Sequence, residues 1–325
     1  MHTPSHVRLL TAALVAAGIV LAGCGSDSSS DSSSDSSPSS SGQGWETTTV
    51  TGDVGTEATV KFDGPVTDSA QSTKVLSEGD GDTVEQGDSL ILHTVIADGT
   101  TQKTVASSYD DHQPQVVSLS SQVQKLFLDA LTGKTIGSRV AVYAPAEDIF
   151  GASGNPQLGI SQKDPIMIIF DLIGKPLDKP DGKQHAAPSW FPKIQKTKGV
   201  ISGLDFAKTP KPDGKFRSAA LYDGTGAVVK KGQTVFARYL GQVYKGKKPF
   251  DENFDADTPA GFQLTSGASG GVIPGWVKGL VGQRVGSRVV MEIPPKDGYG
   301  KAGNSQAGIK GTDTLYFVVD IVGAA

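Results

Sequence analysis

The sequence has 325 residues, of which 37% are hydrophobic and 20% are charged, and a formal net charge of -4. Acidic and basic residues are mixed along the chain, so the basic footprint of a nucleic-acid-binding protein is not expected. Glycine is abundant, at 41 residues, and helical periodicity is rare. Short runs rich in β-branched and aromatic residues lie between turn residues, which predicts strands and little helix.

The first 23 residues have the features of a secretory signal peptide. Residues 9–23 form an apolar run after a weakly basic start, and a membrane span needs about 20 apolar residues. Small residues precede Cys24, the only cysteine, and this pattern resembles the lipobox of bacterial lipoproteins. The resemblance implies a diacylated Cys24 that anchors an extracytoplasmic protein to the cell membrane. An ordinary signal peptide with an incidental cysteine is the alternative.

A Ser/Asp-rich segment follows the cysteine, and we assign residues 24–45 to it. Because it has almost no apolar side chains, it cannot offset the entropy lost on ordering. We therefore expect a disordered tether. The remaining length, about 280 residues, suggests two domains.

An internal repeat supports two domains of one fold. Residues 126–174 align without gaps on 275–323, an offset of 149, and Gly-Ser-Arg-Val at 137–140 matches the same four residues at 286–289. Upstream the offset is 145, because the second copy has a four-residue insertion within 266–271. Matched turn residues over this length imply matched turns. We predict domains at 46–175 and 194–325, joined by a Lys/Pro/Gly-rich linker at 176–193.

The second copy contains several motifs in a fixed order between residues 215 and 323. They are the strand at 232–241, Pro249-Phe250-Asp251, Val-Ile-Pro-Gly-Trp at 272–276, Gly279-Leu280, Ile-Pro-Pro at 293–295, Gly-Tyr-Gly at 298–300 and Leu-Tyr-Phe at 315–317. Together they resemble the FKBP-type peptidyl-prolyl cis–trans isomerases. The resemblance implies an α+β, mainly antiparallel fold: a twisted sheet wrapped around one short helix, present here twice.

The resemblance also implies an apolar pocket with a catalytic rim. Trp276 would form its floor, Asp251 would lie at its edge, and the Tyr299 hydroxyl and the Ile273 N–H would donate to the substrate. Aromatic and aliphatic residues at these spacings could instead form only a sheet core. Two departures affect the rim: Lys310-Gly311 replaces the usual paired prolines, and the loop 252–261 lacks an arginine often found there. The implied walls are Tyr239, Phe250, Val272, Ile273 and Phe317, with Phe262 and Ile309 at further wall positions.

The function implied is isomerisation of X-Pro bonds in secreted or envelope proteins, with proline-containing polypeptides as clients and the family's macrolides as ligands. No cofactor or metal site is expected, since the histidines are isolated and no spacing suggests a zinc site. The rival hypothesis is a non-catalytic FKBP-like binding or chaperone lipoprotein. A solute-binding lipoprotein is disfavoured, because such proteins are larger α/β folds.

The first copy lacks the side chains of this pocket. Thr94 stands for Tyr239, Val105-Ala106 for Phe250-Asp251, Gln124-Lys125 for Ile273-Pro274, Phe127 for Trp276 and Phe150 for Tyr299. We therefore expect residues 46–175 to form an FKBP-like domain with little or no isomerase activity, which serves as a spacer or as a binding surface.

Overall fold

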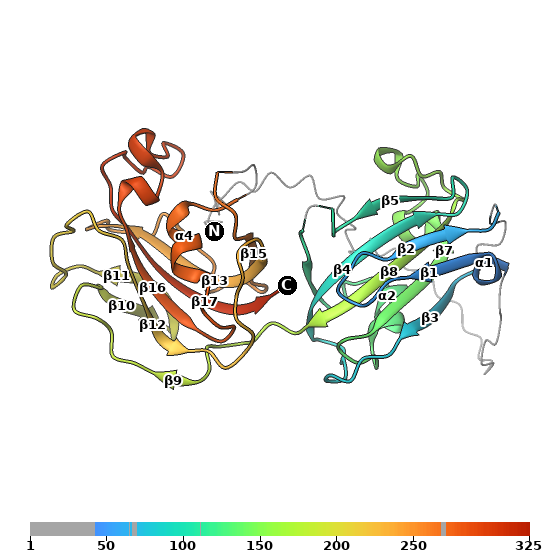
Figure 1. Cartoon of the computed structure of the whole chain (residues 1–325), viewed down its shortest axis with the longest axis horizontal. Coiled ribbons are helices and arrows are strands. Elements are labelled where there is room, and N and C mark those ends of the chain that lie inside the picture. The colour runs from blue at the N-terminus through green and yellow to red at the C-terminus, as the bar shows by residue number, and fades with distance from the viewer. Residues whose placement is uncertain (1–42, 65, 67–69, 111, 268–270) are drawn as a thin grey trace. The chain divides into compact units, whose positions relative to one another are not determined.

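The chain divides into two compact units, one on each side of the Lys175–Pro176 bond. The computed structural model describes residues 43–325 except 65, 67–69, 111 and 268–270. The leader, Cys24 and most of the predicted tether therefore lie outside the described residues. Most of the helices and strands of the two units are labelled in Figure 1.

The N-terminal unit is built on a six-stranded antiparallel sheet. Its strand order is β3-β7-β8-β4-β5, with β6 also paired to β4, and a separate hairpin, β1–β2, precedes it. The elements are α1 (Gln43–Glu46), β1 (Thr48–Thr51), β2 (Thr59–Phe62), β3 (Ser72–Ser77), β4 (Ser89–Asp98), β5 (Lys103–Ser107), β6 (Gln115–Ser118), α2 (Lys125–Leu131), β7 (Arg139–Pro145), α3 (Ala146–Phe150), the 3-10 turn η1 (Pro156–Leu158) and β8 (Pro165–Gly174).

The C-terminal unit repeats this plan with seven strands. The order is β14-β13-β17-β16-β12-β9, with β15 also paired to β13, and β10–β11 forms a separate hairpin. The elements are β9 (Lys183–Gln184), β10 (Lys193–Thr197), β11 (Val200–Asp205), β12 (Arg217–Asp223), β13 (Thr234–Val243), β14 (Asp251–Glu252), β15 (Ala260–Gln263), α4 (Pro274–Leu280), β16 (Arg288–Ile293), the 3-10 turns η2 (Pro295–Asp297) and η3 (Gly300–Ala302), and β17 (Leu315–Ala324).

Each sheet is covered on both faces. Because successive strand residues point to opposite faces, Tyr239 packs in the cluster around α4, whereas its neighbour Leu240 packs in the cluster under the β10–β11 hairpin. In the N-terminal unit, α2 buries Phe127 on one face, and the β1–β2 hairpin covers the other face with Val50 and Val60. The predicted α+β, mainly antiparallel fold class is confirmed.

Strand register shows that the two units are copies of one fold. Arg139 pairs with Asp171 across β7 and β8, and Arg288 pairs with Asp320 across β16 and β17, at the predicted offset of 149. Glycines also make the same close approaches. A Cβ on Gly79 would lie 2.2 Å from a backbone carbonyl oxygen, and one on Gly224 would lie 2.3 Å from the matching oxygen. These glycines allow two backbone segments to touch, so both copies retain them.

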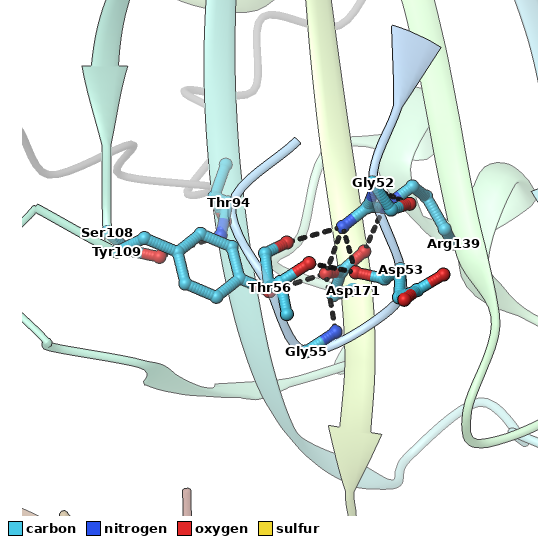
Figure 2. A network of polar contacts seen from close by, with 9 residues as sticks. All are labelled: Gly52, Asp53, Gly55, Thr56, Thr94, Ser108, Tyr109, Arg139 and Asp171. Carbon is cyan, nitrogen blue, oxygen red and sulfur yellow. Dashed lines mark hydrogen bonds and ion pairs between the residues drawn. The ribbon is translucent and has the colours of Figure 1, made fainter. Parts of the chain in front are cut away.

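The Arg–Asp pair is enclosed differently in the two units. In the N-terminal unit, Arg139 donates to Asp171 and to three backbone carbonyls of the β1–β2 turn: those of Gly52, Asp53 and Thr56. The Tyr109 hydroxyl also donates to the Asp171 carboxylate, and Figure 2 shows the whole network. Arg139 and Asp171 are almost completely buried. This network fixes the hairpin to the sheet.

Residues at two of the predicted boundaries make contacts with the adjoining unit. Residues 176–193 are not a free linker, because β9 within them pairs with β12 and Leu177 donates its N–H to the Val322 carbonyl of β17. Phe191 is also buried in the cluster under the β10–β11 hairpin. At the other end, the predicted tether reaches residue 45, but Trp45 packs on Tyr143 with ring centroids 5.8 Å apart. An aromatic side chain near each boundary extends each unit.

Candidate functional site

Ten of the predicted site residues come together on the α4 face of the C-terminal sheet. Strands β13, β15 and β17 supply Tyr239, Phe262 and Phe317. Strand β14 begins at Asp251, α4 supplies Trp276, and the segments between these elements supply the others. Nine of the ten belong to one apolar cluster, and the tenth, Asp251, is hydrogen-bonded to Tyr239. The set is Tyr239, Phe250, Asp251, Phe262, Val272, Ile273, Trp276, Tyr299, Ile309 and Phe317.

Trp276 lies at the centre of the cluster and is 1% exposed. Its ring makes edge contacts with Tyr239 and Phe317 at 5.5 Å each and with Phe262 at 4.8 Å between centroids. Edge-to-face arrangements are favoured for aromatic pairs because the positive ring edge meets the negative face. The Trp276 indole N–H has no hydrogen-bond partner among the described residues. The surroundings of this ring are therefore apolar.

Helix α4 places Trp276 under the sheet. Pro274 occupies its first turn, where a missing N–H costs nothing, and its fixed φ favours helix initiation. Gly275 and Gly279 lie against β16, where an added Cβ would come within 2.6 Å of Ile293 and 2.3 Å of Met291. Small residues on this side thus allow the helix to approach the strand closely. No described residue accepts a hydrogen bond from the Ile273 N–H just before the helix.

Asp251 and Tyr239 form a polar pair at the border of the apolar cluster. The Tyr239 hydroxyl donates to the Asp251 carboxylate at 2.6 Å. Burial raises the pKa of Asp251, and the hydrogen bond from Tyr239 opposes that rise. Burial, followed by the negative charge of Asp251, raises the pKa of Tyr239. The tyrosine therefore stays protonated and continues to donate.

Tyr299 is half-buried in the loop between η2 and η3. Burial raises the pKa of its hydroxyl, whereas a hydrogen bond with Asn304 acts in the opposite direction. Two backbone hydrogen bonds of 2.8 Å between Asn304 and Ile309 close this loop. The Lys278–Asp297 ion pair, at 2.5 Å, connects α4 to η2. Tyr299 itself packs against the apolar cluster that contains Trp276.

Sequence reasoning missed two residues that shape the site border. The Asn253 side chain accepts from the Tyr239 N–H at 2.6 Å and donates to the Ala237 carbonyl at 3.0 Å. Arg238 donates to the Ala256 carbonyl at 2.6 Å, which holds the loop predicted to lack an arginine. Strand alternation could have placed Arg238 on the face opposite Tyr239. No sequence signal pairs Asn253 with β13.

The N-terminal unit has different chemistry at the matching positions. Phe127 replaces Trp276 and packs edge-on against Phe170, with centroids 5.6 Å apart. Gln124, at the position of Ile273, donates from its side chain to the Ile149 carbonyl at 3.0 Å. Phe150 has no hydroxyl where Tyr299 has one. The N-terminal unit therefore has an apolar core where the other unit has the cluster around Trp276, and its Gln124 side chain is hydrogen-bonded within the unit.

Two further features were sought in the part of the chain that the structure describes. No group of three or more His, Cys, Asp or Glu side chains there could hold a metal ion. Among the same residues, no helix has both the length and the apolar character needed to cross a membrane.

Known proteins resemble the C-terminal unit. A family model described as FKBP-type peptidyl-prolyl cis–trans isomerase matches residues 226–322. An FK506-binding protein of Streptomyces anulatus is 37% identical over 102 residues, which are 31% of this chain and 80% of that protein. FK506-binding protein 2 of Dictyostelium discoideum is 34% identical over 126 residues, 38% of this chain and 91% of that protein.

A longer relative matches in the same way. The FKBP-type peptidyl-prolyl cis–trans isomerase FkpA of Escherichia coli K12 is 37% identical over 99 residues, which are 30% of this chain but only 34% of that protein. The similarity to FkpA is therefore to one part of each chain.

Proposed function

The chain belongs to the family of FKBP-type peptidyl-prolyl cis–trans isomerases, and we propose that the cluster around Trp276 is where it binds and turns the prolyl bond. Peptidyl-prolyl isomerisation is the function of the C-terminal unit. The observation that carries the site assignment is the set of three aromatic side chains packed edge-on around Trp276. The half-buried Phe250 and Tyr299 and the Asp251 carboxylate border this set.

An apolar site accelerates this reaction for an electrostatic reason. Rotation about a peptide bond has a barrier of about 20 kcal/mol because twisting breaks amide resonance. The twisted amide has less charge separation than the planar one, so it loses less hydration when it leaves water. An apolar surface of aromatic rings therefore binds the transition state better than the ground state, which lowers the barrier. The step needs no nucleophile and no proton transfer.

Polar groups at the border orient the substrate. In the proposal, the Ile273 N–H and the Tyr299 hydroxyl donate to carbonyls that flank the proline, because no described residue accepts from that N–H. Asp251 contributes by fixing the Tyr239 ring through their 2.6 Å hydrogen bond. The names of the relatives add a further proposal, that FK506-type macrolides occupy the same surface.

Rate and affinity separate an isomerase site from a binding surface. The test uses residues 25–325, X-Pro peptides, and the variants Asp251→Asn and Tyr299→Phe. An isomerase site should lose rate in both variants with a modest loss of peptide affinity. A surface that only binds the peptide should keep its affinity for the peptide in both variants, and the isomerisation rate should not differ between the variants and the original chain. Unchanged rates in both variants would contradict the site assignment.

We also propose that the enzyme acts outside the cytoplasm on secreted or envelope proteins. The support is the sequence pattern of residues 1–23 and the small residues before Cys24, which fit a lipid anchor. The test is detergent-phase partition of the chain expressed in a bacterium, compared with Cys24→Ser. A Cys24→Ser chain that partitions like the original would contradict the anchor.

The N-terminal unit is proposed to be a non-catalytic copy. The support is the loss of the hydroxyl at Phe150 and the Gln124–Ile149 hydrogen bond at the matching position. A spacer and a polypeptide-binding surface both remain compatible with this proposal. Brisk X-Pro turnover by a chain whose C-terminal site carries Phe250→Ala and Tyr299→Phe would contradict it.

A further inference from the structure

The two units have opposite charge, although the whole chain is close to neutral. Residues 43–175 contain 8 lysine and arginine residues against 18 aspartate and glutamate residues, a net of -10. Residues 176–325 contain 21 against 13, a net of +8. Counting over the whole chain, which gives -4, hides this separation. A unit this basic attracts anionic partners in a way that depends on salt.

Seven exposed lysines of the C-terminal unit lie on neighbouring segments. Three come from the β10–β11 hairpin, one from the turn after it, and three from the loop after β13. We call this set the basic face: Lys193, Lys196, Lys198, Lys208, Lys245, Lys247 and Lys248.

Specific contacts hold the hairpin beside the loop. The Gln242 side chain accepts from the Leu204 N–H at 2.9 Å and donates to the Gly246 carbonyl at 2.7 Å. Phe206, next to β11, packs edge-on against Tyr244 with centroids 5.6 Å apart. These contacts bring the lysines of the hairpin and of the loop close together in the folded unit. Figure 1 shows β10 and β11 beside β12 and β16.

The basic face lies on the side of the sheet opposite the catalytic cluster. The hairpin covers the cluster of Leu240 and Val318, whereas Tyr239 and Phe317 point into the cluster around Trp276. A surface that binds through the hairpin would therefore leave the site residues on the other face accessible to clients.

The lysine charges of the basic face are not neutralised within the unit. None of the seven forms an ion pair with a described residue. Lys245 lies over the Tyr244 ring at 5.4 Å, which leaves its charge intact. Two acidic groups near these lysines have other partners. Asp205, which lies opposite Lys193 in the hairpin, accepts from the Ala207 N–H. Asp320, which is near enough to Lys196 to interact with its charge, binds Arg288.

We propose that the basic face docks the C-terminal unit on a bilayer that contains anionic phospholipids. Lysine ammonium groups are compact, mobile point charges that suit a diffuse anionic surface, whereas arginine dominates where a single group is recognised in a fixed geometry. Sites for single-stranded nucleic acid add exposed aromatic rings for stacking, whereas on this face Phe206 and Tyr316 are buried and Tyr244 is half-buried in the same cluster. Charge at the bilayer surface is felt within a Debye length of about 8 Å at physiological ionic strength. Acidic groups farther away than this oppose docking little.

Vesicle binding tests the proposal. Residues 25–325 contain both units but neither the apolar leader nor Cys24, so binding cannot come from insertion of the leader. This chain should co-sediment with vesicles of phosphatidylglycerol and phosphatidylcholine, should not co-sediment with phosphatidylcholine alone, and should dissociate as salt is raised. Absence of phosphatidylglycerol-dependent binding would overturn the proposal.

Charge-reversal variants locate the binding surface. Lys193→Glu, Lys196→Glu and Lys198→Glu together should weaken vesicle binding at least 10-fold. The matched control changes Lys230, Lys231 and Lys296 to Glu, three exposed lysines outside the basic face that alter net charge equally. The control should bind within about 2-fold of the original, and X-Pro turnover by both variants shows that they are folded. Equal weakening in the two variants would overturn the proposal, as would saturable binding to polyglutamate with none to the vesicles.

Discussion

The two units share a scaffold and differ in almost everything attached to it. Both retain the Arg–Asp pair between the central strands, the same register and the same glycine contacts. Where one unit has Trp276, Tyr299 and Asp251, the other has apolar side chains: Phe127, Phe150 and Ala106. The comparison teaches that close backbone approach and register specify this fold, whereas the side chains of the α4 face vary without disturbing it.

The largest expected difference concerns the Arg–Asp pair itself. Arg139→Ala leaves the Asp171 carboxylate buried without its partner and removes three bonds to the hairpin turn, so it should destabilise the N-terminal unit by about 3–5 kcal/mol. Arg288→Ala should cost its unit less, because the Arg288 side chain is 15% exposed and has fewer carbonyl partners. Urea unfolding of each variant, followed by hydrogen exchange assigned to each unit, measures both. Equal costs would contradict the role given to the hairpin network.

The next difference is the pH dependence of stability. A histidine at position 93 should make the stability of the N-terminal unit depend on pH, whereas the matching residue of the other unit should not. His93 is buried against Tyr109, and burial lowers its pKa from 6.5 to about 4. Because the unfolded chain binds the proton more readily, this contribution to stability is complete above pH 6.5. It is lost as pH falls through about 4, with a slope of about 1.4 kcal/mol per pH unit. The matching residue of the other unit is Arg238, which does not titrate.

Substitution with a non-titrating side chain checks this assignment. His93→Gln should flatten the stability of the N-terminal unit between pH 6.5 and 4 and leave the C-terminal unit unchanged. Stability is measured by urea unfolding at several pH values. A His93→Gln chain with the original pH dependence would show that other groups, such as carboxylates, cause the loss.

The internal repeat of the sequence predicted the register of the two sheets, and the motifs predicted which side chains pack around Trp276. Offsets of 149 and 145 reproduce the observed register, since Thr94 pairs with Phe170 as Tyr239 pairs with Val319. These predictions succeed because turn glycines and strand alternation are local signals. The sequence did not predict the two hairpins that cover the outer faces, because they lie largely outside the aligned repeat. It also missed Asn253, whose contacts depend on how the segment after β14 folds back on β13.

Charge shows a similar limit of sequence reasoning. Acidic and basic residues appear mixed when the chain is read as one list, yet they separate once the unit boundary is known. The basic face needs more than that boundary. Gln242 must bring the loop after β13 to the β10–β11 hairpin before lysines about 50 residues apart become neighbours.

Truncation of Phe250 tests how far the α4 face of one unit can change. Phe250 packs edge-on against Phe317 at 5.6 Å and remains half-buried. Phe250→Ala removes apolar surface from the proposed site, worth about 1.5–3 kcal/mol when fully buried, so kcat/KM for an X-Pro peptide should fall about 10-fold or more. The matched change in the other unit, Val105→Ala, should leave kcat/KM unchanged. A loss of turnover in Val105→Ala would mean that the first unit takes part in catalysis.

The smallest expected effect comes from exchanging one hydroxyl between the units. Tyr299→Phe removes a donor proposed to hold a substrate carbonyl, so kcat/KM should fall about 5- to 10-fold, the equivalent of one neutral hydrogen bond of about 1 kcal/mol. The reciprocal change, Phe150→Tyr, should add no activity to a chain whose C-terminal site is weakened by Phe250→Ala together with Tyr299→Phe. The first unit still lacks the indole and the Tyr–Asp pair, and Gln124 is bonded to Ile149 beside this position. Turnover gained from Phe150→Tyr would contradict this prediction. It would show that a single hydroxyl is enough to give the first copy isomerase activity, without the indole or the Tyr–Asp pair.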